Sequence, residues 1–209
     1  MKRTIYALCT ALCALFAIVS CSKSDDGQRE VDFLQERRDI IPDRLLEEMK
    51  NKGMQINEGD NPPDIQGIFQ TSKFVLIYTN MRADTLGKKY DAYRYKFYEQ
   101  NGVKLKADRA DKDNPEDTNA AGKGAIISGS GNKFTLFLKI EGVTLKVPNK
   151  EAHIVSGEIT PEGIKDLQMG FCMVEKNDPK GKLVPEGGIR VFNTESGLAV
   201  RKQKYPTGD

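Results

Sequence analysis

Few residues in this 209-residue chain are of the types that carry out chemistry, and their spacing limits the reactions they could support. His153 is the only histidine, and it follows Glu151 at a predicted strand edge. A histidine base most often activates a neighbouring Ser or Cys, and no recognisable nucleophile motif accompanies this one. We therefore expect His153 to be a surface or pocket residue. No catalytic residue is assigned, and the chain is predicted not to be an enzyme.

The chain also has few residues or motifs that could support cysteine, metal or phosphate chemistry. Cys172 lies between Phe171 and Met173 in an apolar stretch, which is typical of a small core residue. Zinc sites need several His or Cys ligands at short spacing, and the chain has none in that pattern. Gly129-Ser130-Gly131 lacks the Lys-Ser/Thr that follows in a phosphate-binding loop, so we expect a hairpin turn. We predict neither a metal nor a cofactor.

One acidic segment has the composition of a calcium loop. Its carboxylates are Asp108, Asp111, Asp113, Glu116 and Asp117. A calcium loop of EF-hand type needs Gly at its sixth position, and this segment has a carboxylate there. Arg109 and Lys112 also interleave positive charge. We therefore predict a solvated polar loop between residues 108 and 122.

The most useful candidate for binding is an aromatic face. Tyr93, Tyr95 and Phe97 alternate with polar or outward-facing residues, so in a strand all three point the same way. Aromatic walls with tyrosine hydroxyls could hold an apolar or sugar-like ligand. The alternative is that the three rings are ordinary core.

The N-terminus carries an export and anchoring signal. Lys2 and Arg3 precede an apolar run from Ile5 to Val19, which is too short for a comfortable membrane span. The run ends at Ile18-Val19-Ser20-Cys21, which resembles a bacterial lipobox, and polar residues follow at once. Cys9 and Cys13 also lie in the apolar run, but each follows leucine, where a lipobox has a small residue. We predict cleavage before Cys21 and lipidation of its thiol; the alternative is an ordinary signal peptide or an uncleaved anchor.

Cleavage would change the charge balance. Removing residues 1–20 takes away two of the 32 basic residues and none of the 30 acidic ones, so the formal charge falls from +2 to zero. A nucleic-acid-binding chain should show a basic face, and none is evident. With Cys21 lipidated, Cys172 has no partner for an internal disulfide.

Downstream, the apolar periodicity changes from helical to strand-like. Ser22–Glu30 is polar and predicts a flexible tether. Pro42–Lys52 predicts a helix with one apolar stripe that ends at Gly53, and a Pro-rich linker follows. From Gly67 on, about ten short strands with tight turns predict an antiparallel up-and-down barrel, with a β-sandwich as the alternative. Two of the predicted turns, at Gly142 and at Pro148-Asn149-Lys150, enclose a short strand from Val143 to Val147. The predicted parts are a signal peptide (1–20), a tether (21–30), the helix and linker (31–64) and a β-barrel domain (65–204).

Three stretches together resemble a family: IIPDRLLEEMKNKGMQIN, NPPDIQGIF and GKGAIISGSGNKFTLF. They are similar to a set of uncharacterised lipoproteins of Bacteroidetes-type bacteria, which resemble lipocalins in outline. Gly67-Ile68-Phe69 stands where lipocalins have Gly-x-Trp, and the chain has no Trp. The resemblance implies a lipocalin-like barrel and an envelope location, lipid-anchored to the outer membrane on its periplasmic face or at the cell surface.

These features lead to two functional expectations. The first is a membrane-anchored lipoprotein whose barrel binds a small hydrophobic or sugar-like ligand at Tyr93, Tyr95 and Phe97. The second is a non-catalytic structural lipoprotein that docks on an outer-membrane protein complex. The expected partners are the lipid bilayer through acylated Cys21, a small ligand or an outer-membrane protein, and not nucleic acid. A cavity of roughly several hundred cubic ångströms that reaches Tyr93 and Tyr95 favours the first, and a filled interior with an exposed apolar patch favours the second.

Overall fold

The computed structural model describes residues 23–111 and 120–206, which form two helices and eleven strands. Of the described residues, 23–35 belong to one unit, and those from Glu36 onward belong to a second that contains the whole sheet. The predicted signal peptide and the lipidation site Cys21 lie outside the described residues.

Helix α1 (Lys23–Ile40) occupies the segment that the sequence predicts to be a tether. The predicted tether covers residues 21–30, and from Lys23 to Glu30 the chain is helical instead; the described residues contain two helices where the sequence predicts one. The prediction rested on low apolar periodicity, but the segment contains no proline. Its last turn also carries Arg37 and Arg38, whose positive charge is favourable at a helix C-terminus.

Helix α2 (Asp43–Asn51) confirms the predicted helix to within a residue at each end. Pro42 precedes it, where a missing N–H costs no hydrogen bond. The helix ends in the predicted way: the Met54 amide donates to the Met49 carbonyl (3.0 Å) and the Gly53 amide to the Lys50 carbonyl (3.2 Å). Gly53 has φ +106°, so these two bonds form a Schellman stop.

The eleven strands are all antiparallel to their neighbours and belong to one sheet. Their bounds are β1 (Gly67–Gln70), β2 (Phe74–Thr79), β3 (Lys89–Tyr90), β4 (Tyr93–Asn101), β5 (Lys104–Asp111), β6 (Ala120–Ser130), β7 (Lys133–Thr144), β8 (Val147–Ile159), β9 (Gly163–Lys176), β10 (Ile189–Thr194) and β11 (Leu198–Lys202). One continuous sheet confirms a mainly β, antiparallel fold, whereas a β-sandwich would need two sheets.

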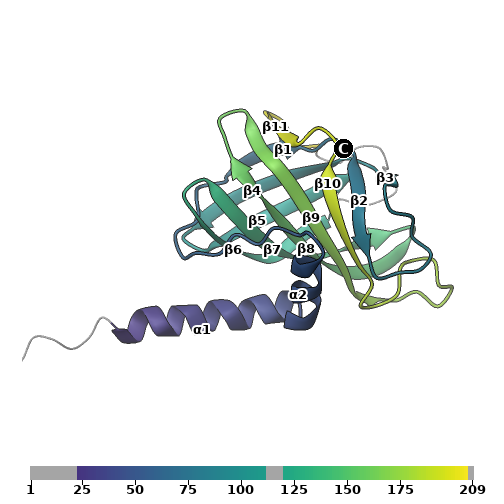
Figure 1. The fold of residues 1–209 in the computed structure, drawn as a ribbon, viewed down its shortest axis with the longest axis horizontal. Helices are drawn as coiled ribbons and strands as arrows, with labels where there is room; N and C mark the ends of the chain where they lie inside the picture. The colour runs from purple at the N-terminus through teal and green to yellow at the C-terminus, as the bar shows by residue number, and fades with distance from the viewer. Residues whose placement is uncertain (1–22, 112–119, 207–209) are drawn as a thin grey trace, which may run out of the picture. The chain divides into compact units, whose positions relative to one another are not determined.

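Eight of these strands close into a ring. The order β1-β4-β5-β6-β7-β8-β9 is completed by β11, which pairs with both β9 and β1. Strand β9 pairs with β11 through residues 163–165 and with β10 through residues 168–172. Strands β10, β2 and β3 therefore extend the sheet from β9 as a three-stranded arm (Figure 1).

The β7–β8 hairpin differs from its prediction. The sequence suggests turns at Gly142 and at Pro148, with a short strand between them, but both residues lie inside long strands. The turn is at Leu145 and Lys146, which have φ +49° and +65°. The Pro148 carbonyl accepts from the Asn177 amide just beyond β9, so its missing N–H would also point past that strand and costs no bond to β7.

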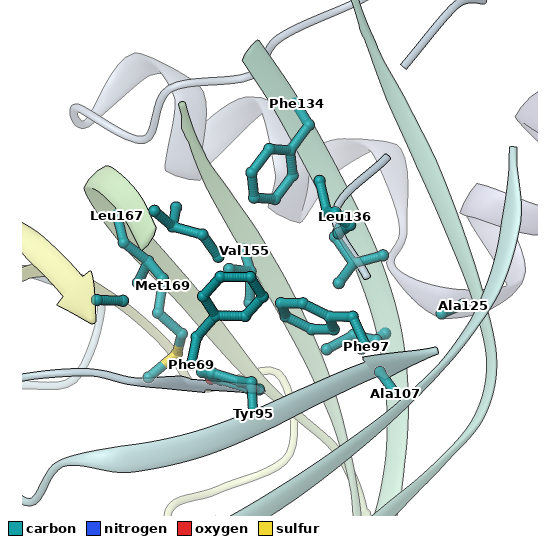
Figure 2. Packing of buried hydrophobic residues seen from close by; sticks show 14 of the residues in the cluster. Phe69, Tyr95, Phe97, Ala107, Ala125, Phe134, Leu136, Val155, Leu167 and Met169 are labelled. Carbon is teal, nitrogen blue, oxygen red and sulfur yellow. The ribbon is translucent and has the colours of Figure 1, made fainter. Parts of the chain in front are cut away.

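The ring interior is filled by apolar side chains. Phe69, Tyr95, Phe97 and Phe134 are each at most 1% exposed, and they pack with Val155 and Met169 from the opposite strands (Figure 2). Stacked and tilted rings, such as Tyr95 with Phe97 at 5.6 Å between centroids, hold this packing together.

Helix α2 covers part of the outer face of the sheet. Its buried residues are Leu45, Leu46 and Met49. A Cβ on Gly170 of β9 would lie 3.0 Å from Met49 Sδ, so the glycine permits close approach. Residues 152–157 of β8 are all buried without alternation, so both faces of this part of the strand are covered.

Candidate functional site

A cavity of about 140 Å³ lies between the inner faces of the ring and the arm; we call it the ring–arm cavity. The ring supplies residues of β4, β5, β7, β8 and β9, and the arm supplies residues of β2, β3 and β10. Much of its wall is aromatic, from Phe74, Tyr90, Tyr93, Phe171 and Phe192. Met169 and Met173 complete the apolar part. This lining suits a flat or apolar ligand.

A buried charged cluster forms one side of the cavity. Arg109 Nη1 donates to Glu151 Oε2 at 2.9 Å, and His153 Nε2 lies 2.9 Å from the same oxygen. The side chains of Arg109 and Glu151 are only 9% and 5% exposed, and His153 is fully buried. The Tyr95 hydroxyl lies 3.5 Å from His153 Nδ1. Four polar groups from β4, β5 and β8 thus meet in the apolar interior.

The protonation states in this cluster follow from burial and from Arg109. Burial is the main cause that lowers the pKa of His153, so its ring is neutral at pH 7. Burial alone would raise the pKa of Glu151, but the Arg109 charge and the His153 hydrogen bond lower it to about 2. Glu151 is therefore ionised. A neutral His153 that donates from Nε2 to Glu151 can accept from Tyr95 at Nδ1, so one tautomer satisfies both contacts.

The arm contributes a second arginine. Arg190 Nε and Nη2 donate to the two oxygens of Asp84 at 2.8 and 2.7 Å. Its guanidinium lies 5.2 Å from the centroid of the Tyr90 ring, as that of Arg109 lies 4.8 Å from the centroid of Tyr93. Two arginine–tyrosine stacks therefore form parts of the cavity wall, and each arginine is paired with a carboxylate.

Two buried polar atoms of the lining make no hydrogen bond of normal geometry to the described residues. The Tyr90 hydroxyl and Arg109 Nε are buried, and neither makes a hydrogen bond within the described protein. Asp84 lies close enough to affect the pKa of Tyr90, which burial chiefly raises, but it does not meet the geometry of a hydrogen bond to the hydroxyl. Buried donors without an acceptor are uncommon in proteins, so these two groups are good candidates for contacts with a ligand.

The predicted aromatic face is divided between two roles. Tyr93 lines the ring–arm cavity. Tyr95 and Phe97 pack in the filled part of the ring and do not line it. The three side chains do share one face, so the predicted alternation matches the burial pattern of β4.

Sequence reasoning missed Arg109 and Glu151 as interior residues. Arg109 was grouped with a solvated loop, although it continues the inward alternation of Leu105 and Ala107. Glu151 and His153 likewise precede buried Val155 at two-residue spacing. The signal available in the sequence was a charged residue at a position that the two-residue alternation directs toward the interior. The expectation of a surface or pocket location for His153 is replaced by full burial beside the cavity.

The remaining candidates have simple outcomes. Cys172 is 1% exposed, and burial raises the pKa of its thiol to about 11. Gly129-Ser130-Gly131 lies at the β6–β7 turn, as expected. The acidic segment falls partly outside the described residues. Within residues 23–111 and 120–206, no group of three or more His, Cys, Asp or Glu side chains is placed to hold a metal ion.

The outer surface offers a groove. The groove lies between residues 80–84 and residues 182–188, with a volume of about 600 Å³. Among the described residues, the large apolar side chains that are exposed are Val31, Leu86, Leu145 and Val200, which come from four separate segments.

No helix within the described part of the chain is both long and apolar enough to cross a membrane. Comparison of the chain with protein-family models, with curated proteins and with solved structures finds no match in any of the three.

Proposed function

We propose that this chain is a lipid-anchored envelope lipoprotein that binds a small ligand in the ring–arm cavity. In this proposal the ring is a lipocalin-like barrel, and acylated Cys21 holds it to the outer membrane. The lipobox-like sequence before Cys21 supports the anchor, and the eight-stranded ring supports the barrel. The observation that carries the binding role is a cavity whose walls combine aromatic rings with buried, partly unpartnered polar groups.

The cavity narrows the class of ligand. Sites for drug-sized molecules usually have volumes of roughly 300–1,000 Å³. A volume of about 140 Å³ is well below that range, and Tyr95 and Phe97 fill the interior where a larger lipocalin ligand would lie. The ligand we propose is therefore small, and it contacts Tyr93 but neither Tyr95 nor Phe97.

A non-catalytic role is proposed for the same site. His153 does not line the cavity, and its two ring nitrogens contact Tyr95 and Glu151. A base buried in this way has no route to a substrate in the cavity without moving its neighbours.

A second candidate is an interaction lipoprotein that docks on an outer-membrane protein complex. The filled ring interior and the groove between residues 80–84 and 182–188 favour it. The scattered positions of the exposed apolar side chains give it less support than the cavity gives to ligand binding.

Native mass spectrometry of the full-length protein, extracted from its own cells, tests the two candidates. Ligand binding predicts a bound mass of a small molecule that is released by Tyr93→Ala. Docking predicts a protein partner instead, unaffected by that substitution. A protein that carries neither mass would contradict both.

A further inference from the structure

We infer that the ring–arm cavity selects an uncharged, single-ring molecule that carries a hydrogen-bond acceptor. This inference rests on the proposed function, since it names the chemistry of the ligand for that same cavity. It is argued from the size of the cavity, from its charge balance and from its unpartnered donors.

Size limits the ligand to about one ring. An apolar cavity of about 150 Å³ holds a single benzene molecule. The ring–arm cavity, at about 140 Å³, is of the same size. Its walls include Phe74, Phe171 and Phe192, whose rings can pack on the faces and edges of a planar ligand.

The charge balance argues against an ionic ligand. Arg109 is paired with Glu151 at 2.9 Å, and Arg190 is paired with Asp84 at 2.7 Å. His153 is neutral because burial lowers its pKa. The charged side chains of the lining are thus all paired with an opposite charge, and the exposed Lys88, whose ammonium lies 5.1 Å from the centroid of the Tyr90 ring, is outside the lining. A charged ligand would enter a low-dielectric site whose lining holds no free counter-charge.

The unpartnered groups specify an acceptor. Arg109 Nε can only donate a hydrogen bond, and the Tyr90 hydroxyl can donate or accept. Only 8% of the surface of Arg109 is exposed. A carbonyl or hydroxyl oxygen on the ligand would satisfy donors that make no bond within the described protein, and an apolar ligand would leave them unsatisfied.

Three matched compounds test the inference. Benzamide, benzoate and benzylammonium each have one ring, and at pH 7.4 they are neutral, anionic and cationic. Binding to the full-length protein, purified in one detergent, is measured by ligand-observed NMR and by calorimetry. We expect benzamide to bind at least about tenfold more tightly than either ion, because each ion would lose its hydration without gaining a counter-charge.

Tyr90→Phe locates the binding site. Its hydroxyl makes no hydrogen bond within the described protein, so its loss should leave the fold intact and weaken benzamide binding about three- to tenfold. Tyr98→Phe is the matched control, because its hydroxyl lies 3.4 Å from Asp108 and does not line the cavity. Arg109→Lys keeps the positive charge beside Glu151, removes the Nε donor and should also weaken benzamide binding.

The outcomes separate the two proposals. Tighter binding of benzoate or benzylammonium, lost in Tyr93→Ala, would overturn the inference and leave ligand binding in the cavity standing. Equal binding of benzamide by Tyr90→Phe and the wild type would also overturn it. If none of the three compounds binds and no small molecule co-purifies, the proposed function fails as well.

Discussion

At the scale of single residues, the buried cluster of Arg109, Glu151 and His153 links stability to pH. The folded protein keeps His153 neutral because burial lowers its pKa below the ordinary value of 6.5. As pH falls through 6.5, the unfolded chain binds a proton that the folded chain does not bind. Acid therefore favours unfolding, and the stabilising contribution is complete only above that pH.

We expect the free energy of unfolding to fall between pH 7 and pH 5, by at most about 1.4 kcal/mol per pH unit for the one proton involved. His153 is the only histidine, and most carboxylates titrate below this window. Urea denaturation at several pH values measures the slope. His153→Gln, which cannot be protonated, should remove most of it, and an unchanged slope in that variant would contradict the assignment.

Glu151 extends the same dependence to lower pH. Its folded pKa of about 2 lies below the model-peptide value of 4.5, so its contribution is present above pH 4.5 and is lost as pH falls toward 2.

The sequence predicted the residue-scale features unevenly. The alternation of Tyr93, Tyr95 and Phe97 follows from a two-residue period and is visible in the chain itself. The pairing of Arg109 with Glu151 is not, because it depends on β5 and β8 meeting across the ring although 42 residues separate the two side chains. Tertiary pairing, and not local pattern, places these charges together.

At the scale of elements, closure of the ring depends on Gly163. This residue begins β9 opposite Val200 of β11, with φ +154°. A Cβ here would overlap the carbonyl oxygen of Ala199, which is backbone and cannot rotate away. Glycine therefore permits the two strands to come together.

We expect Gly163→Ala to destabilise the protein by about 2–4 kcal/mol, because it adds overpacking to an unfavourable backbone conformation. Gly187→Ala is the matched control: its φ is +76°, but an added Cβ meets nothing within 4 Å. That variant should lose only about 1–2 kcal/mol. Urea denaturation of both compares them, and equal losses would show that steric overlap at the ring closure is unimportant.

Most elements were predictable where local signals agree. Helix α2 has a preceding proline, an apolar stripe and a terminal glycine, and all three act within a few residues. The β7–β8 hairpin was misjudged because Gly142 and Pro148 usually mark turns. Their neighbours in the sheet decide otherwise: long strands on both sides hold these residues extended.

At the scale of the whole molecule, the proposal depends on the N-terminal anchor. A single acyl chain gives only marginal membrane binding, whereas the diacylglycerol expected on Cys21 supplies two chains.

We expect Cys21→Ser to abolish lipidation and to move the protein out of the envelope membrane fraction. Fractionation with mass spectrometry of the mature N-terminus measures both effects. Cys172→Ser is the matched control. Because the Cys172 thiol is buried, this substitution should leave the location of the protein unchanged. A Cys21→Ser protein that stays in the membrane fraction without acyl mass would contradict the anchor.

The ring also has a consequence for the order in which the protein folds. The strand pairing that closes the ring joins Ile68 of β1 to Lys202 of β11, so two segments from opposite ends of the domain must meet. Such distant pairing raises the contact order and slows folding to roughly milliseconds or seconds. Until residues 198–202 arrive, both β1 and the start of β9 expose unpaired backbone. A newly made chain would be vulnerable to aggregation in that interval, and protection by a chaperone would matter most then.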